Sequence, residues 1–269
     1  MAEPALQLDG VSAGYGETVV LEDIRLALAA GETLSIIGRN GVGKTTLLAT
    51  VMGHNTLHGG DVRLHGKTIA RLPAHRRNWA GLGYVPQERE VFPSLTLREN
   101  LEVAARPGAW TIDKVFGLFP RLAERLGAAP SMLRPAGRRR DVVEESMHLL
   151  DTLKLADDAG HRVSELPYGR QRLVEIAIAL AQHPRVLLLD EPAAGVPSSE
   201  SHLILDVIGG LDPDIAILII EHDMDVVFRF ASRITVLVAG AVLTEGTPQE
   251  IRADARVRAV YLGEEFPHG

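Results

Sequence analysis

One stretch decides the fold of this chain: Gly38-Arg39-Asn40-Gly41-Val42-Gly43-Lys44-Thr45-Thr46. It fits the pattern G-x-x-x-x-G-K-[ST], a loop whose backbone amides and lysine bind phosphate groups. Its glycines let the backbone approach phosphates in conformations that a Cβ would block. The apolar run Thr33–Ile37 before it predicts a buried strand, and Leu47–Met52 after it predicts a helix. This context argues against a simple Gly-rich turn, so we expect the loop and the helix N-terminus to bind an anion.

Composition narrows the class of protein. The chain has 269 residues, of which 46% are hydrophobic and 23% charged, as in an ordinary globular protein. Its net charge of −7 argues against nucleic acid as the main partner, and the lack of cysteine excludes disulfides and thiolate metal sites. We expect no signal peptide at the N-terminus. The longest apolar runs, such as Ile215–Ile220, are far shorter than the ~20 residues that span a bilayer. We therefore expect the chain to reach a membrane only through a partner.

Short apolar runs elsewhere predict an α/β fold. Two of them, Val186–Asp190 and Ile215–Ile220, read as buried parallel strands, and polar residues follow at the end of each. Open α/β sheets bind ligands at that edge, which makes Asp190, Glu191 and His222 candidate site residues. Further strands are predicted at Leu6–Val11, Leu21–Leu28 and Leu82–Val85, with a loop at Ser12–Glu17 and hairpins at Gly59–Ile69 and Ile234–Glu245.

The middle of the chain changes character and predicts helices. They are expected at Leu97–Ala105, Ile112–Leu126, Asp141–Leu155 and Arg170–Ala181, with an amphipathic tail helix at Pro248–Gly263. The segment Gly127–Arg140 is rich in Gly, Pro, Ala and Arg and predicts a surface connector. Its three arginines at 138–140 are most simply a solvated helix start, although a contact with a membrane surface is the alternative.

From about Leu6 to Gly263, these motifs resemble the ATP-binding-cassette ATPases, the motor subunits of ABC transporters. The resemblance implies a P-loop NTPase core of mainly parallel sheet with helices, an antiparallel β subdomain and an inserted α-helical subdomain. It places the core at 1–87 and 166–247, the helical subdomain at 88–165 and a helical tail at 248–269. It also implies ATP and Mg²⁺ as ligands.

The resemblance assigns roles residue by residue. Lys44 falls in the Walker A loop and would reach the β- and γ-phosphates. Glu191 would orient and activate water, and His222 would contact the γ-phosphate and hold Glu191. Taken alone, Tyr15 reads better as a surface or packing residue and His222 as a structural histidine, and only the resemblance reverses both readings. The remaining residues are assigned to adenine stacking (Tyr15), to Mg²⁺ (Thr45, Gln87, Asp190), to contact with the transport partner (Gln87, also counted as catalytic), and to the signature that faces a nucleotide (Tyr168, Gly169, Arg170).

Two motifs depart from the family pattern. The usual signature Leu-Ser-Gly-Gly-Gln is here Leu166-Pro167-Tyr168-Gly169-Arg170. The serine hydroxyl is therefore absent, and Pro167 has no N–H to donate. Gly169 remains, and Arg170 adds a cation that could compensate in part. The segment Ala193–Pro197 lacks the acid that usually follows Walker B. Both departures bear on a closed two-cassette site rather than on nucleotide binding.

Other stretches resemble one subfamily, the importers of branched-chain amino acids. Its two ATPases are both represented: one by residues 190–195, 220–224, 245–248 and 260–263, the other by 91–96 and 116–122. Urea or a short amide is an alternative substrate. The implied partners are a second cassette, of a different kind or identical, membrane-spanning permeases and, indirectly, a solute-binding protein, at the cytoplasmic face of the membrane. The competing hypotheses are a soluble ATPase of DNA repair or translation and a nucleotide-binding regulator without turnover.

Overall fold

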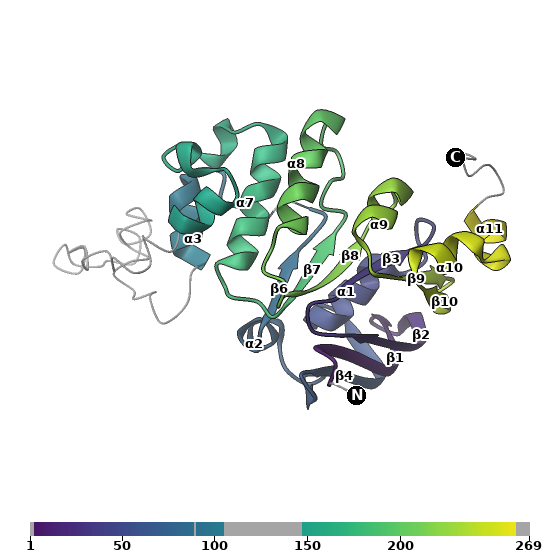
Figure 1. Ribbon diagram of the computed structural model, residues 1–269. Helices are drawn as coiled ribbons and strands as arrows, with labels where there is room; N and C mark the ends of the chain where they lie inside the picture. Colours follow the sequence, from purple (N-terminus) through teal and green to yellow (C-terminus); the bar gives the residue numbers. More distant parts are fainter. Residues whose placement is uncertain (1–2, 89, 105–146, 262–269) are drawn as a thin grey trace. The chain divides into compact units, whose positions relative to one another are not determined.

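The computed structural model describes residues 3–88, 90–104 and 147–261 (Figure 1). Its contacts divide the chain into unit 1, residues 1–89 and 184–269, and unit 2, residues 90–183. The predicted domain boundaries stay a prediction. This division differs from them mainly because it groups residues 166–183 with unit 2 rather than with the core, and it keeps residues 88–89 and 248–269 in unit 1. The predicted helix at 112–126, the connector at 127–140 with its arginines, and the stretch 116–122 lie outside the described residues.

The main sheet of unit 1 has six strands in the order β10-β9-β3-β8-β7-β6 (Figure 1). The five from β9 to β6 are parallel, and β10 is antiparallel to β9. Every residue of β7 and β8 is buried, as expected for parallel strands covered on both faces. This confirms the predicted parallel α/β core. The strand bounds are β3 Thr33–Ile37, β6 Leu82–Val85, β7 Val186–Asp190, β8 Ala216–Ile220, β9 Arg233–Val238 and β10 Ala241–Gly246.

A second, antiparallel sheet has the order β2-β1-β4-β5 and confirms the predicted β subdomain. Its strands are β1 Leu6–Tyr15, β2 Thr18–Leu28, β4 Thr56–Leu64 and β5 Lys67–Thr68. The loop predicted at Ser12–Glu17 is too long: β1 continues to Tyr15, and only Gly16 and Glu17 form the turn into β2. Gly14 permits this close pairing, since a Cβ there would lie 1.9 Å from the backbone oxygen of Thr18.

Helix α1, Lys44–Met52, lies between the two sheets of unit 1 (Figure 1). All its residues except Thr45 are buried, and its apolar side chains share one core with both sheets. Its C-terminal end is held by Arg77, from α2 (Ala74–Trp79), which is 3% exposed. The Arg77 guanidinium donates to the carbonyl oxygens of Thr50 at 2.7 Å and Val51 at 2.8 Å. Such bonds satisfy carbonyls that a helix end leaves without an intrahelical partner.

The other helices of unit 1 are α8 Ser198–Gly209, α9 Met224–Phe230, α10 Pro248–Ala253 and α11 Ala255–Tyr261. A second apolar cluster joins α9, α10 and α11 to β9. The predicted tail is helical as far as Tyr261, but as two helices: Thr247 begins α10 with a capping box, and extended backbone at Asp254 separates it from α11.

Unit 2 contains α3, Leu97–Ala104, and α7, Tyr168–Leu180, which pack against each other. Residues 147–152 are helical and belong to the helix predicted at 141–155, whose first six residues are not described. Two 3₁₀ turns, Ala156–Asp158 and Val163–Glu165, lead to α7. Buried Glu175 of α7 pairs with Arg172 and accepts a hydrogen bond from the backbone N–H of Glu90 at 3.2 Å.

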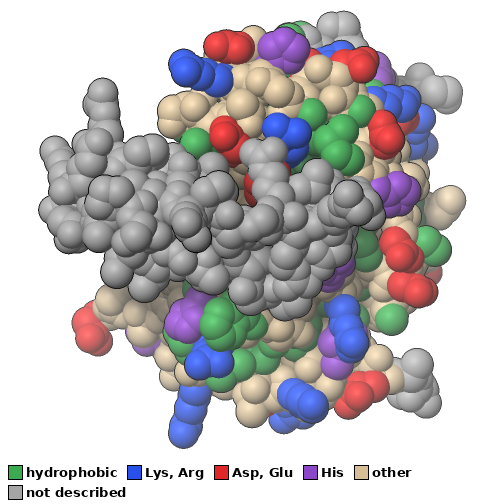
Figure 2. Space-filling model, turned by 90° about the vertical axis from the view of Figure 1, so that its left-hand side faces the viewer, with side chains coloured by type: hydrophobic (Ala, Val, Ile, Leu, Met, Phe, Trp, Pro, Cys, Tyr) green, Lys and Arg blue, Asp and Glu red, His purple; other side chains and the backbone are tan. Residues whose placement is uncertain are grey.

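On the face shown in Figure 2, acidic and basic side chains of the described residues are interspersed with apolar ones. The net charge of −7 is therefore not gathered into one acidic patch on that face. Among the helices that the structure describes, none combines the length and apolar character that crossing a bilayer requires.

Candidate functional site

The phosphate-loop motif forms the bend that leads from β3 into α1. Gly43 caps the helix with φ of 103°, a left-handed conformation, and a Cβ there would lie 2.8 Å from a methyl of Leu21. At Gly38 a Cβ would lie 2.6 Å from the carbonyl oxygen of Leu237. Only glycine satisfies both positions without displacement, so these two residues permit the tight loop that the sequence predicts.

Lys44 is the first residue of α1 and is 6% exposed. Its Nζ donates to the carbonyl oxygens of Gly38 at 2.7 Å and Arg39 at 3.2 Å, within its own loop. Burial lowers the pKa of the Lys44 ammonium, while the carboxylates of Glu191 and Asp190 act in the opposite direction. The loop thus presents a partly desolvated ammonium group beside two carboxylates. The ammonium group favours an anionic ligand, and the carboxylates favour a cation bound with it.

Asp190 and Glu191 stand at the C-terminal edge of the main sheet. Asp190 ends β7 opposite Ile220 of β8 and is fully buried. Glu191 follows with φ of 46°, and its N–H donates to the carbonyl oxygen of Ile220 at 3.0 Å. A left-handed conformation at a residue other than glycine costs about 1–3 kcal/mol and concentrates at functional sites. The backbone therefore holds Glu191 in a strained, defined position.

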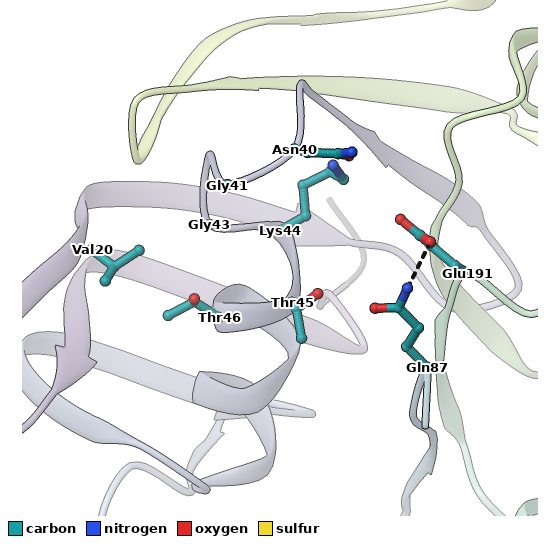
Figure 3. Close-up of a pocket in the computed structure, with 9 residues that line it drawn as sticks. All are labelled: Val20, Asn40, Gly41, Gly43, Lys44, Thr45, Thr46, Gln87 and Glu191. Carbon is teal, nitrogen blue, oxygen red and sulfur yellow. Dashed lines mark hydrogen bonds between the residues drawn. The ribbon is translucent and has the colours of Figure 1, made fainter. Parts of the chain in front are cut away.

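Two other predicted residues converge on the Glu191 carboxylate. Gln87, which follows β6, donates from Nε2 to Glu191 Oε2 at 3.1 Å (Figure 3). Nδ1 of His222, which follows β8, lies 3.9 Å from the same oxygen. The histidine side chain is 61% exposed and stands just beyond hydrogen-bond distance. The ends of three parallel strands thus bring together groups that are far apart in the sequence.

Two cavities collect most of the predicted site. The first, about 300 Å³, opens between the phosphate loop on one side and Gln87 and Glu191 on the other (Figure 3). The second, about 480 Å³, is shared by Glu191, His222 and the start of the loop. Val20 of β2 also lines the first cavity and was missed, because no motif marks it. The predicted residues in one or both are Gly38, Arg39, Asn40, Gly41, Gly43, Lys44, Thr45, Thr46, Gln87, Glu191 and His222.

Three predicted residues of unit 1, Tyr15, Val42 and Asp190, do not line either cavity. Tyr15 ends β1 and is 54% exposed, so its ring is available for stacking on a ligand. Val42 packs against the apolar core instead.

The signature residues lie at the start of α7 in unit 2. Pro167 is the N-cap residue and provides no side-chain cap. Tyr168 is 42% exposed, while Gly169 is buried. The Arg170 guanidinium forms an ion pair with Asp158 in the same unit. The cation suggested as compensation for the altered signature is therefore already engaged in this state.

The comparisons with known proteins agree with this geometry. The family model described as ABC transporter matches residues 21–194, well over half of the chain.

This chain belongs to the ABC transporter family.

A second model, described as branched-chain amino acid ATP-binding cassette transporter, matches residues 241–267. The cassette is 34% identical over 268 residues to the high-affinity branched-chain amino acid transport ATP-binding protein BraF of Pseudomonas aeruginosa, covering 98% of this chain and 100% of the relative. It is 33% identical over 266 residues to LivG of Escherichia coli K12, a protein with the same description, covering 98% and 100%. The lipopolysaccharide export ATP-binding protein LptB of Acidithiobacillus ferridurans is 34% identical over 262 residues, covering 97% and 98%.

Solved structures of ATP-binding cassettes share the fold of this chain. A nucleotide-free ATP-binding cassette from an ABC transporter superposes with a TM-score of 0.80 at 25% identity, covering 97% of this chain and 100% of the other. A solved ADP conformation of an ATP-binding cassette of an ABC transporter gives a TM-score of 0.78 at 26% identity, covering 97% and 99%. The predicted ABC-type P-loop fold is therefore confirmed, and with it ATP as the family's ligand.

Proposed function

We propose that this chain is the ATP-hydrolysing subunit of an importer for branched-chain amino acids. The observation that carries the substrate class is the match of residues 241–267 to the branched-chain amino acid cassette model. Full-length identity alone does not choose it, because the export protein LptB is as similar as BraF. A related small polar solute such as urea or a short amide is the nearest alternative, and lipopolysaccharide export is the one that the LptB similarity favours.

The site supports in-line transfer of the γ-phosphoryl group to water. The loop amides and Lys44 would bind the phosphate chain, because a buried cation and helix N-terminal amides both stabilise anions. Glu191 would accept a proton from the attacking water. Gln87 and His222 would hold that carboxylate and sense the γ-phosphate, since both lie beside its Oε2. Tyr15 would stack on the adenine, for which its exposed ring is suited.

The residues of the site also fit a magnesium ion. Thr45 hydroxyl, Gln87 carboxamide and Asp190 carboxylate are hard oxygen donors, and such a site usually provides one or two carboxylates while phosphates and water complete the shell. When bound with the nucleotide, Mg²⁺ would neutralise phosphate charge. Thr45 and Gln87 line the same cavity, and Asp190 directly precedes Glu191.

Retained Glu191 and His222, lying 3.9 Å apart, favour an active ATPase over a regulator without turnover. The proposed partners are a second cassette, permeases that anchor the chain at the cytoplasmic face of the membrane, and indirectly a solute-binding protein. If the second cassette is a different ATPase, we propose that the two nucleotide sites are unequal. The site facing Pro167 would close more weakly, since it lacks a hydroxyl and an N–H.

The decisive experiment reconstitutes the chain with its permeases and solute-binding protein and measures uptake of labelled leucine, urea and acetamide. We expect ATP-dependent leucine uptake that Lys44→Ala abolishes. Uptake of urea or acetamide alone, or no uptake, would reject the substrate assignment. Hydrolysis by a homodimer that Pro167→Ser leaves unchanged would reject the unequal sites, whereas faster closure of one site in the Ser variant would support them.

A further inference from the structure

Glu221 is a buried carboxyl group that the proposed chemistry does not use. It follows the last residue of β8, stands between Ile220 and His222, and is 2% exposed. The five residues before it are all apolar and buried, so another apolar residue at position 221 would carry no desolvation cost. Burial raises the pKa of the Glu221 carboxyl, and the nearby Glu191 acts in the same direction, so an acid at this position is costly.

The contacts of Glu221 explain why an acid is placed there. Its Oε1 accepts a hydrogen bond from the backbone N–H of Ala193 at 3.4 Å, and the backbone N–H of His222 is also directed at the carboxyl. Ala193 lies two residues after Glu191, in a turn that is closed by a hydrogen bond of 3.0 Å from the Ala194 N–H to the Glu191 carbonyl oxygen. One side chain therefore joins the turn after Glu191 to the segment that carries His222.

We propose that Glu221 is a positioning residue for hydrolysis, which rests on the proposed roles of Glu191 and His222. The strained backbone of Glu191 must be held on both sides. Its own N–H is fixed to Ile220 of β8, and the turn that follows it is fixed through Ala193 to Glu221. Without this acceptor, the turn after Glu191 becomes more mobile. The side chains of Glu191 and His222 are then no longer held at a fixed distance from each other, while the phosphate loop keeps its geometry.

The test compares Glu221→Gln, which keeps an oxygen acceptor, with Glu221→Leu, which keeps the volume but removes it. Ile217→Val, on the same strand but away from the cavities, controls for a general loss of stability. We measure steady-state ATP hydrolysis by the full chain, ATP affinity, and hydrogen exchange of residues 191–196 without nucleotide. In the Leu variant we expect kcat to fall about tenfold or more, because misplacement of a catalytic group by about 1 Å can cost up to about 10²-fold. KM and ATP affinity should change less than about twofold, since uniform binding is kept.

In the Gln variant, kcat and exchange should stay close to the parent, and in the Leu variant exchange at 191–196 should rise. If Glu221→Leu fails to fold, Glu221→Asp, whose shorter side chain withdraws the acceptor, decides the question with the same readouts. A Leu variant with parental kcat and exchange, or a Gln variant as impaired as the Leu variant, would overturn the proposal. Hydrogen exchange reports on the turn even if Glu191 is not the base, whereas parental hydrolysis by Glu191→Gln would reject the proposed role of Glu191 and leave the exchange result standing.

Discussion

Replacing Glu191 by glutamine is the sharpest test of the proposed chemistry. Glutamine keeps the size of the side chain and an oxygen that can accept the bond from Gln87 Nε2, now 3.1 Å long. The backbone bond to Ile220 is unaffected, because it uses the N–H of the residue. The change therefore removes the negative charge and the ability to accept a proton, and little else.

The size of the effect follows from that loss. A positioned general base contributes about 10²–10⁴-fold to the rate. A loss of at least ~10²-fold corresponds to about 2.7 kcal/mol of barrier. ATP affinity should hold or rise, because a carboxylate beside the phosphate site is removed while Asp190 still favours the charged form of Lys44.

The assay is phosphate release at saturating MgATP together with equilibrium binding of ATP. Glu22→Gln, an exposed residue of β2 away from both cavities, is the matched control and should keep the parental rate. Lys44→Ala should show the opposite pattern, with binding itself weakened. Hydrolysis by Glu191→Gln at the parental rate would refute the assignment of Glu191 as the base.

Three further changes test other parts of the cassette. Tyr15→Ala should weaken ATP binding by about 1–3 kcal/mol, the scale of base–aromatic stacking, while Tyr15→Trp is tolerated; unchanged affinity by titration would return Tyr15 to a packing role. Arg77→Leu should lower the free energy of unfolding by about 3 kcal/mol, since it leaves buried carbonyls of α1 unsatisfied, against little change for exposed Arg76→Leu; equal melting curves would contradict this. The raised pKa of Glu221 means that the parent loses stability as pH rises above the ordinary glutamate pKa of about 4.3. Glu221→Gln should therefore gain stability over the parent with rising pH in denaturant titrations, and a pH-independent difference would argue against the shift.

Much of the fold could be predicted because its signals are local. The apolar runs of β7 and β8 identify strands buried on both faces. The final hairpin was predicted from Ala239-Gly240, and both residues have positive φ, 45° and 80°, as a two-residue turn of this kind requires. The end of β1 could not be predicted, because its turn-forming residues are held extended by partners on β2 and β4.

The site residues also fall into those that the sequence predicts and those that it does not. Residues of contiguous motifs were predicted, since the chemistry of each motif is written in neighbouring positions. Val20 and Glu221 were missed because they act through their place in three dimensions: Val20 lies against the phosphate loop, and Glu221 holds the turn after Glu191. The pairing of Arg170 with Asp158 was equally hidden, because the 3₁₀ turn Val163–Glu165 and an unpatterned loop separate them.

The costs of this structure are concentrated at one edge of the main sheet. Glu191 adopts a left-handed conformation, Lys44 is an ammonium group with 6% exposure, and Glu221 is a carboxyl group with 2% exposure. Glycine at position 191, and uncharged side chains at positions 44 and 221, would avoid these costs. Lys44 and Glu191 instead line the two cavities, and Glu221 holds the turn that follows Glu191. The free energy of folding is thus less favourable at the positions that would bind an anionic ligand and orient the Glu191 carboxylate. These are the positions where the proposed hydrolysis requires rigid, partly desolvated charges.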